Sequence, residues 1–251
     1  MKAIILAAGA SKRMISLTTT LPKCLLKIGD QSLIEHQIAT LHHYGIHDIV
    51  MVTGFCEDKI KKTCGNQIRY VSNHRFAETN SMYSLWLAKE EAREGFVVLN
   101  ADVLFHPLIL GKLLASPYPD ALTLSRQDEL GEEEMKIEVQ SARVVAISKE
   151  LSPHQADGEN VGIIKFSPQG AHLLFEKIDE LIAQGIVTKW APFAFQQIAS
   201  YHPLYAVDIG DLPWIEIDFI EDYERAQNEV YPRIIRYQGN EGNPLVTHKI
   251  T

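Results

Sequence analysis

The sequence predicts an α/β fold in which a mostly parallel β-sheet carries helices on both faces. Three observations predict it: short apolar segments of strand length, helical segments between them, and turn residues where each apolar segment ends. Continuous apolar segments are typical of strands buried on both faces, and alternation of strand and helix is typical of parallel sheets. In such sheets, ligands bind outside the carboxyl ends of the strands.

The first hundred residues supply four strands with helices between them. Apolar segments predict strands at 3–8, 49–52, 68–71 and 96–99. Apolar spacing and propensity predict helices at 33–44, 57–63 and 81–93. Asp30 or Ser32 is the expected N-cap of the first helix. The order is therefore βαβαβαβ, which favours a parallel arrangement of these strands.

After about residue 120 the pattern changes to short β segments with few helices. Strands are expected at 121–125, 135–139, 144–148, 161–166, 204–207 and 214–217, and helices at 170–183, 190–200 and 220–235. No linker or repeat separates these elements, so we expect one domain over residues 1–237 with a β-rich elaboration. Residues 238–251 are polar, and we expect them to form a loosely ordered tail.

Composition restricts the class of protein. The 251 residues contain 24 Lys and Arg against 32 Asp and Glu, which gives a net charge of −8. This acidity argues against a nucleic-acid polymer as partner but leaves open a single cleft for an anionic ligand. No apolar segment approaches the 18 or so residues that a membrane span requires, so no membrane partner is expected. The three cysteines form no CxxC motif, which indicates a reducing, cytoplasmic setting.

Two basic segments follow the first strand. Residues 6–13 read Leu-Ala-Ala-Gly-Ala-Ser-Lys-Arg, and residues 21–26 read Leu-Pro-Lys-Cys-Leu-Leu. Small residues such as Gly9 let the backbone approach a nucleotide, and loop N–H groups can bind phosphate oxygens. Arg13 can bind two phosphate oxygens at once, and Lys23 offers a compact charge for a phosphoryl group in transfer. The alternative is a tight turn with two solvated cations.

These motifs resemble the signature of the nucleotidyltransferases that activate sugars and small alcohols as nucleoside diphosphate conjugates. The usual form is Gly-x-Gly-Thr-Arg, whereas residues 9–13 lack the second glycine and the threonine. The resemblance extends to Glu-Ile-Asp at 216–218, and it implies a Rossmann-like fold of the nucleotide-diphospho-sugar transferase type. A nucleotide-binding part would cover about 1–119 and an acceptor-binding part about 120–237. The resemblance also implies that the nucleotide is contacted by Leu6, Ala8, Gly9, Ala10, Lys12, Arg13, Lys23 and Ala101. Of these residues, Arg13 and Lys23 would also be catalytic.

Two carboxylates follow strands that are far apart in the sequence. Asp102 comes just after strand 96–99, and Asp218 follows strand 214–217, so both can reach the same edge of the sheet. Mg²⁺ binds one or two carboxylates together with substrate phosphates. In the superfamily that the chain resembles, the matching pair holds the catalytic Mg²⁺, which implies the same here. Glu216 points to the same side as Asp218 and is a candidate for the acceptor pocket. The alternatives are a helix cap for Asp102 and a solvated strand residue for Glu216.

Residues 78–85 read Glu-Thr-Asn-Ser-Met-Tyr-Ser-Leu. Thr79, Asn80 and Ser81 are all good helix N-caps, but a helix needs only one, and a helix N-terminus also favours anions. The segment resembles the branch of the superfamily that contains bacterial phosphocholine and 2-aminoethylphosphonate cytidylyltransferases. In that branch it lies against the cytidine and its phosphates. Asn80 and Ser84 are therefore expected to contact base or phosphate, with capping as the alternative.

The acceptor would be bound by residues of both parts. In related enzymes a lysine at the place of Lys136 touches the acceptor phosphate, and a solvated ion pair is the alternative. A cationic acceptor head requires aromatic faces or carboxylates, such as Glu216. The aromatic candidates, for each of which burial in the core is the alternative, are Tyr83, Trp86, Trp190, Tyr205 and Trp214.

Together these features predict a Mg²⁺-dependent cytidylyltransferase that transfers CMP from CTP to a small aminoalkyl phosphate or phosphonate, with release of pyrophosphate. Phosphocholine is the first choice of acceptor and 2-aminoethylphosphonate the second. A sugar 1-phosphate with another nucleotide is the third. A nucleotide-binding regulator without turnover is the rival from another class, and the presence of Lys23 and both carboxylates disfavours it. The sequence leaves a homodimer open.

Overall fold

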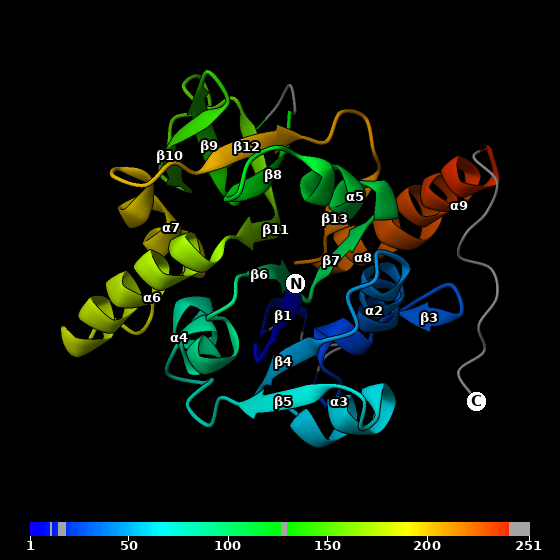
Figure 1. Cartoon of the computed structure of the whole chain (residues 1–251). Coiled ribbons are helices and arrows are strands. Elements are labelled where there is room, and N and C mark those ends of the chain that lie inside the picture. Colours follow the sequence, from blue (N-terminus) through cyan, green and yellow to red (C-terminus); the bar gives the residue numbers. More distant parts are fainter. Residues whose placement is uncertain (11, 15–18, 127–129, 241–251) are drawn as a thin grey trace.

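The structure is a computed structural model, and it describes residues 1–10, 12–14, 19–126 and 130–240. Within these residues, nine strands form one mixed sheet in the order β5-β4-β1-β6-β11-β8-β12-β10-β9. Helices cover both faces of this sheet (Figure 1). The α/β architecture expected from the sequence is therefore confirmed. None of the described helices has the length and apolar character needed to cross a membrane.

All ten predicted strands are present, with ends shifted by at most three residues. The main sheet contains β1 (Lys2–Ala7), β4 (Ile49–Thr53), β5 (Arg69–Ser72), β6 (Phe96–Asn100), β8 (Ala121–Ser125), β9 (Lys136–Gln140), β10 (Arg143–Ser148), β11 (Gly158–Phe166) and β12 (Tyr205–Asp208). Two smaller pairs join β2 (Lys27–Ile28) to β3 (Gln31–Ser32) and β7 (Val103–Phe105) to β13 (Trp214–Glu216). Strands β2, β3 and β7 were not predicted, because two or three residues are too few to show a pattern.

The helices are α2 (Leu33–His43), α3 (Glu57–Cys64), α4 (Ser81–Leu87), α5 (Pro107–Ala115), α6 (Pro168–Ala183), α7 (Ala191–Ala199), α8 (Ile220–Arg225) and α9 (Tyr231–Asn240). Short 3-10 segments are η1 (Lys12–Met14), η2 (Lys23–Leu25) and η3 (Lys89–Glu91), and a π-helical turn, η4 (Ala226–Val230), joins α8 to α9. The N-cap of α2 is Ser32, which forms a capping box with Glu35.

Three helical predictions need correction. The helix expected at 81–93 ends at Leu87, and η3 follows it. Helix α5 was missed, although His106 as N-cap and Pro107 in the first turn are both helix-start signals. The closing helix expected at 220–235 is divided into α8, the π-helical turn η4 and α9, and α9 runs to Asn240, into the tail expected from residue 238. Residues 241–251 of the expected tail lie outside the described residues.

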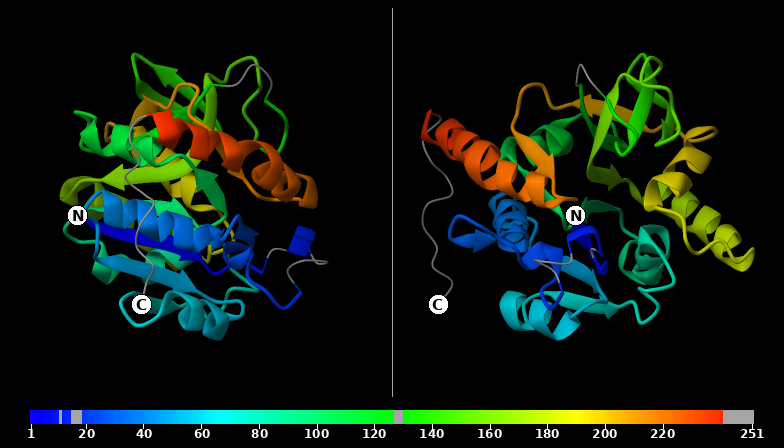
Figure 2. Two further views of the ribbon diagram at one scale, coloured as in Figure 1. Left: turned by 90° about the vertical axis from the view of Figure 1, so that its right-hand side faces the viewer. Right: turned by 180° about the vertical axis from the view of Figure 1, so that it is seen from behind.

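The β-rich part continues the main sheet. Strands β5, β4, β1 and β6 are parallel, and β11 pairs antiparallel with β6 and with β8. Strand β9 pairs with β10 and also with β11, so the strands β11, β8, β12, β10 and β9 close on themselves as a small barrel. In Figure 1 this barrel lies above the parallel strands, and Figure 2 shows the same stacking from the side and from behind. The two expected parts of the chain therefore meet along β6 and β11.

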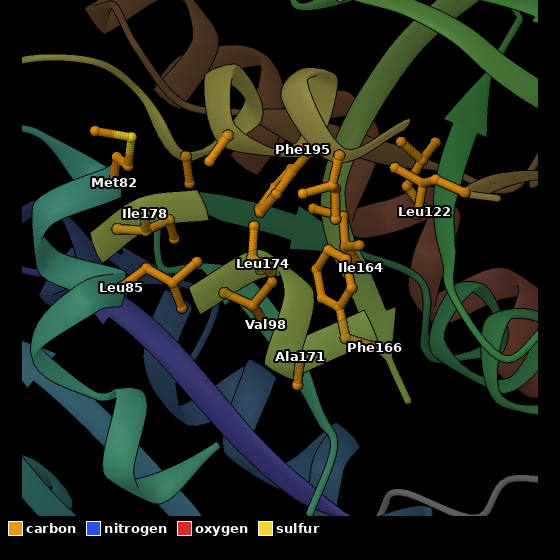
Figure 3. Close-up of a cluster of buried hydrophobic side chains, with 14 of the residues drawn as sticks. Met82, Leu85, Val98, Leu122, Ile164, Phe166, Ala171, Leu174, Ile178 and Phe195 are labelled. Carbon is orange, nitrogen blue, oxygen red and sulfur yellow. The ribbon is translucent and has the colours of Figure 1, made fainter. Parts of the chain in front are cut away.

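Alternate residues of the strands enter two cores. On β1, Ile4 faces the core beneath α4, α6 and α7, while Ala3 and Ile5 face the core beneath α2 and α5. Figure 3 shows the first core, with side chains from α4, α6 and α7 packed against β6 and β11, namely Met82, Leu85, Leu174, Ile178, Phe195, Val98 and Ile164. Burial on both faces explains why the strand sequences are continuously apolar.

Candidate active site

A cavity of about 380 Å³ lies at the carboxyl ends of β1 and β6, between the parallel strands and the barrel. Most predicted site residues line it, and these are Leu6, Ala8, Gly9, Arg13, Lys23, Asn80, Ser84, Asp102, Trp190, Glu216 and Asp218. Ala101 lines a smaller cavity of about 50 Å³ that shares Lys23 and Asp102 with the larger one. Of the described residues predicted for the site, Ala10, Tyr83 and Lys136 line neither. The Lys12 side chain lies outside the described residues.

Lys23 is the cation at the centre of the site. It begins η2, and its neighbours Cys24 and Leu25 are buried beneath it. Its Nζ lies 2.9 Å from Asp102 Oδ2 and 2.8 Å from Asp218 Oδ1. Burial alone would lower the pKa of Lys23, but the two carboxylates outweigh it and raise the pKa above the ordinary value. The ammonium is therefore charged at neutral pH and bridges the two carboxylates.

A local pairing brings the acidic residues together. Strand β13 runs antiparallel to β7 with Glu216 opposite Val103, and the Ile217 N–H donates to the Asp102 carbonyl at 3.0 Å. One carboxylate oxygen from each of Asp102, Glu216 and Asp218 lies within 4.8 Å of the others. Burial, followed by the charges of Asp102 and Asp218, raises the pKa of Glu216 to about 8. The meeting of Asp102 and Asp218 that strand order predicted is therefore present.

The acidic residues fit a divalent cation. Asp102 Oδ1 is buried and has no hydrogen-bond partner in the described part of the chain. A buried carboxylate oxygen without a partner is unfavourable, and a bound cation would satisfy it. Oxygen ligands from a few carboxylates, completed by substrate phosphates, are the set that Mg²⁺ prefers.

Arg13 reaches this centre from the loop after β1. Its Nη2 donates to Asp218 Oδ2 at 2.8 Å, and its Nη1 donates to Glu133 Oε2 at 2.9 Å. The guanidinium also lies 4.9 Å from the centre of the Phe219 ring. Burial lowers the pKa of Arg13, but Asp218 and Glu133 outweigh it, so the net shift is upward. Arg13 therefore stays charged beside the acidic cluster.

Asn80 and Ser84, at the start of α4, both line the cavity. Asn80 Oδ1 accepts a hydrogen bond from the Ser81 N–H at 2.8 Å, so Asn80 caps α4 while also lining the cavity. Ser84 Oγ accepts from Asn73 Nδ2 at 3.0 Å, and the same Nδ2 donates to Thr79 Oγ1 at 3.1 Å. Asn73 lines the cavity and was missed, although it directly follows β5 and the position after a strand is the signal that found Asp102.

Trp190 places an aromatic side chain in the lining of the cavity. Its side chain is 48% exposed, and Lys149 Nζ lies 5.1 Å from the centre of its ring. The Ala191 N–H donates to Ser81 Oγ at 2.9 Å, which ties the start of α7 to the N-terminus of α4. Trp190 is therefore held beside the segment that contains Asn80.

Lys136 and Tyr83 do not lie where an acceptor contact requires. Lys136 is buried, and its Nζ donates to the backbone carbonyl of Lys149 at 2.8 Å instead of entering the cavity. Tyr83 packs beside Trp86, with ring centres 5.3 Å apart, and beneath the Arg75 guanidinium. The cavity-lining lysine in this region is Lys149, directly after β10. Its position after a predicted strand is the signal that could have found it.

Comparisons with known proteins identify the relatives of this chain. The model of a MobA-like NTP transferase domain matches residues 3–133, just over half of the chain. A choline-phosphate cytidylyltransferase of Streptococcus pneumoniae is 38% identical over 121 residues, which are 47% of this chain and 52% of that protein. The match thus spans about half the length of that relative. A CTP:phosphoglutamine cytidylyltransferase of Campylobacter jejuni is 25% identical over 89% of this chain and 98% of its own length.

A solved structure shares the fold. The inositol-1-phosphate CTP transferase from T. maritima superimposes with a TM-score of 0.79 at 23% identity, and the alignment covers 96% of this chain and 97% of that one. The nucleotidyltransferase fold expected from the sequence is confirmed by this likeness. The match over residues 3–133 shows that the chain belongs to the family of MobA-like NTP transferase domains.

Proposed function

We propose that the chain is a Mg²⁺-dependent cytidylyltransferase that transfers CMP from CTP to a small aminoalkyl phosphate or phosphonate and releases pyrophosphate. The observation that carries the proposal is the Lys23 ammonium between Asp102 and Asp218, in a cavity lined by both parts of the chain. The names of the two cytidylyltransferase relatives support the choice of CTP and of a phosphorylated acceptor.

The proposed reaction needs no general base. An anionic oxygen of the acceptor phosphate attacks the α-phosphorus of CTP, and one P–O bond forms. The P–O bond between the α-phosphorus and the bridging oxygen breaks, and its electron pair leaves with pyrophosphate. Because the nucleophile is already an anion, catalysis comes from alignment and from neutralisation of charge.

The charged residues have separate roles in this scheme. Lys23 lies where it can neutralise the α-phosphate, and Arg13 offers its guanidinium to the leaving phosphates. Asp102 and Asp218 would hold Mg²⁺, which neutralises charge on the phosphate oxygens when bound. Trp190 and Glu216 line the part of the cavity available to the acceptor head group.

Phosphocholine is the first choice of acceptor, because the half-exposed face of Trp190 suits a quaternary ammonium. The second choice, 2-aminoethylphosphonate, is favoured by a specific observation. Lys149 already lies over Trp190, and the carboxyl group of Glu216 lines the same cavity. A primary ammonium can donate hydrogen bonds to carboxylates, whereas a quaternary ammonium cannot.

Pyrophosphate release from CTP and Mg²⁺ tests the proposal. The panel contains phosphocholine, 2-aminoethylphosphonate, a phosphorylated amino acid amide and several sugar 1-phosphates. We expect release only when an acceptor is present, and fastest with phosphocholine. If CTP binds but no acceptor gives release, the chain is a nucleotide-binding protein and the proposed activity is wrong. Release with sugar 1-phosphates alone would move the acceptor to the third choice.

A further inference from the structure

Glu133 joins the two sides of the cavity through one carboxylate oxygen. Its Oε2 accepts a hydrogen bond from Arg13 Nη1 at 2.9 Å and another from Lys149 Nζ at 3.3 Å. Arg13 lies in η1 after β1, Lys149 follows β10, and Glu133 comes from the segment before β9. All three residues line the cavity.

The two cations together form a site for an anion. A guanidinium and an ammonium that share one oxygen are the donors with which proteins commonly bind a phosphate group. Their hydrogen bonds, that of Arg13 first, hold the pKa of Glu133 below its usual range, so the bound group is a carboxylate anion at neutral pH. Before a substrate binds, the chain itself therefore supplies the anion.

We infer that Glu133 is a built-in competitor for a phosphate or phosphonate group of the substrate, which displaces it from Arg13 and Lys149. This inference rests on the proposed function, because it requires a phosphorylated substrate in the same cavity. It adds Lys149 to the substrate-binding residues and gives Glu133 a role that weakens binding.

Glu133 differs from the other acidic residues of the cavity in its surroundings. Its side chain is 61% exposed, whereas that of Asp218 is 21% exposed. Asp218 has Lys23 and Arg13 as partners, and with Asp102 it belongs to the cluster that fits a cation. Displaced Glu133 can turn into water as a solvated carboxylate, so its release leaves no buried charge without a partner.

Both cations keep a second partner when Glu133 leaves. Arg13 remains bound to Asp218 through Nη2, and its guanidinium remains beside the Phe219 ring. Lys149 remains over the Trp190 ring, 5.1 Å from its centre. The anion site therefore stays formed after displacement, which is the condition for an incoming phosphate to replace the carboxylate.

Two substrates offer the required chemistry. The triphosphate of CTP would approach from the side of Arg13, and the acceptor phosphate or phosphonate would approach from the side of Lys149. Both carry negatively charged oxygens on phosphorus, so the geometry identifies the chemical group that binds but not which of the two substrates carries it. Separate measurements on the two substrates distinguish them.

The test uses the full chain and the substitution Glu133→Gln, which removes the charge and keeps the shape. Glu132→Gln is the matched control, because Glu132 is an exposed neighbour for which no contact with Arg13 or Lys149 is found among the described side chains. Inorganic pyrophosphate is the probe, titrated by calorimetry. We expect Glu133→Gln to bind pyrophosphate about two- to five-fold more tightly than the unchanged chain, because pyrophosphate no longer has to displace an exposed ion pair. Glu132→Gln should bind pyrophosphate with the affinity of the unchanged chain.

Equal or weaker binding by Glu133→Gln would overturn the inference, because Glu133 would then hold the cations in place or do nothing. In steady-state assays, a lower KM for the acceptor assigns the anion site to the acceptor phosphate, and a lower KM for CTP assigns it to the triphosphate. Tighter pyrophosphate binding without cytidylyl transfer would support the inference and refute the proposed function. Transfer with unchanged pyrophosphate binding would do the reverse.

Discussion

The two sides of the cavity differ in how the chain assembles them. On the nucleotide side, Gly9, Arg13 and Lys23 come from one continuous stretch after β1. On the acceptor side, the cavity-lining residues come from separate segments, including the ends of β10 and β13 and the start of α7. Closure of the barrel brings these segments together. One continuous stretch of sequence thus supplies the basic residues of the proposed nucleotide side, whereas long-range packing positions the residues of the proposed acceptor side.

This difference has a consequence for substitutions. Changes at the nucleotide side should stop the reaction for every acceptor, because the same charges act on every transfer. Changes at the acceptor side should alter which acceptor binds and leave the affinity for CTP nearly constant. Changes where the two sides meet should affect the stability of the whole molecule.

The largest expected effect is at the nucleotide side. Lys23→Ala and Asp102→Asn should each lower kcat/KM by about 10²–10³-fold or more, because each removes a charge that acts on the reacting phosphate. Initial rates of pyrophosphate release measure this effect, and circular dichroism checks the fold. Lys27→Ala is the control, since the Lys27 side chain is exposed and donates to the Asp30 carbonyl. Near-normal activity of Lys23→Ala would refute its role.

The next effect is on stability, where the two sides meet. Gly162 in β11 has a φ of +85°, and an added Cβ would lie 2.8 Å from Asn100 Nδ2. We expect Gly162→Ala to lower the free energy of unfolding by about 2–3 kcal/mol, from backbone strain together with this clash.

Gly45→Ala separates the two causes of that loss. Gly45 has a φ of +75° with open space around it, so its substitution should cost only the strain, about 1 kcal/mol. Urea denaturation measures both variants. Equal losses would mean that the clash between the added Cβ and Asn100 costs nothing.

A smaller effect is expected at the acceptor side. Trp190→Ala should raise the KM for the acceptor about three- to ten-fold, because a cation loses an aromatic face, and should leave the KM for CTP within about two-fold. Tyr201→Ala, at an exposed aromatic residue just after α7, is the control. A similar rise in both KM values would show that the two sides do not act separately.

The smallest effect concerns Glu57, a carboxylate at the carboxyl ends of two strands that is not among the residues lining the cavity. Glu57 accepts hydrogen bonds from Thr53 Oγ1 at 2.7 Å and from Ser72 Oγ at 2.6 Å, at the carboxyl ends of β4 and β5. Burial raises its pKa, but hydrogen bonds from Lys61, Ser72 and Thr53 outweigh this and lower it from 4.5 to about 2.

Because the folded pKa is depressed, Glu57 stabilises the fold above pH 4.5, and this contribution is lost as the pH falls toward 2. Glu57→Gln should therefore lower stability at neutral pH and make the loss of stability between pH 4.5 and 2 less steep, by only a fraction of the one-proton limit of about 1.4 kcal/mol per pH unit, because solvent screens this partly exposed carboxylate. Thermal unfolding between pH 5 and about 2.5 measures it, and activity at neutral pH should not change. An unchanged acid slope would contradict this role for Glu57.

The same contrast explains what could be predicted from the sequence. The strands of the parallel half were found because burial on both faces makes them continuously apolar, as in β1 and β4. Arg13 and Asp102 were found because each follows such a strand, where ligands bind in parallel sheets. These signals are local, so a single sequence contains them.

The acceptor side could not be predicted in the same detail. Lys136 pairs with Ser148 across β9 and β10, so Lys136 and Lys149 are close in space, and both were available to line the cavity. Which lysine enters it depends on the register of β10 and on the closure of β9 onto β11. Glu133 and Arg13 are likewise 120 positions apart in the sequence, and only the folded chain brings them into contact.

The most direct test of the account follows the α-phosphorus of CTP. CTP labelled at that atom is incubated with the chain, Mg²⁺ and phosphocholine or 2-aminoethylphosphonate, and the products are separated. We expect the label to appear in a cytidine diphosphate conjugate of the acceptor, in amounts equal to the unlabelled pyrophosphate released, and only when Lys23 is present. Label that stays in CTP or leaves as free CMP with every acceptor would contradict it.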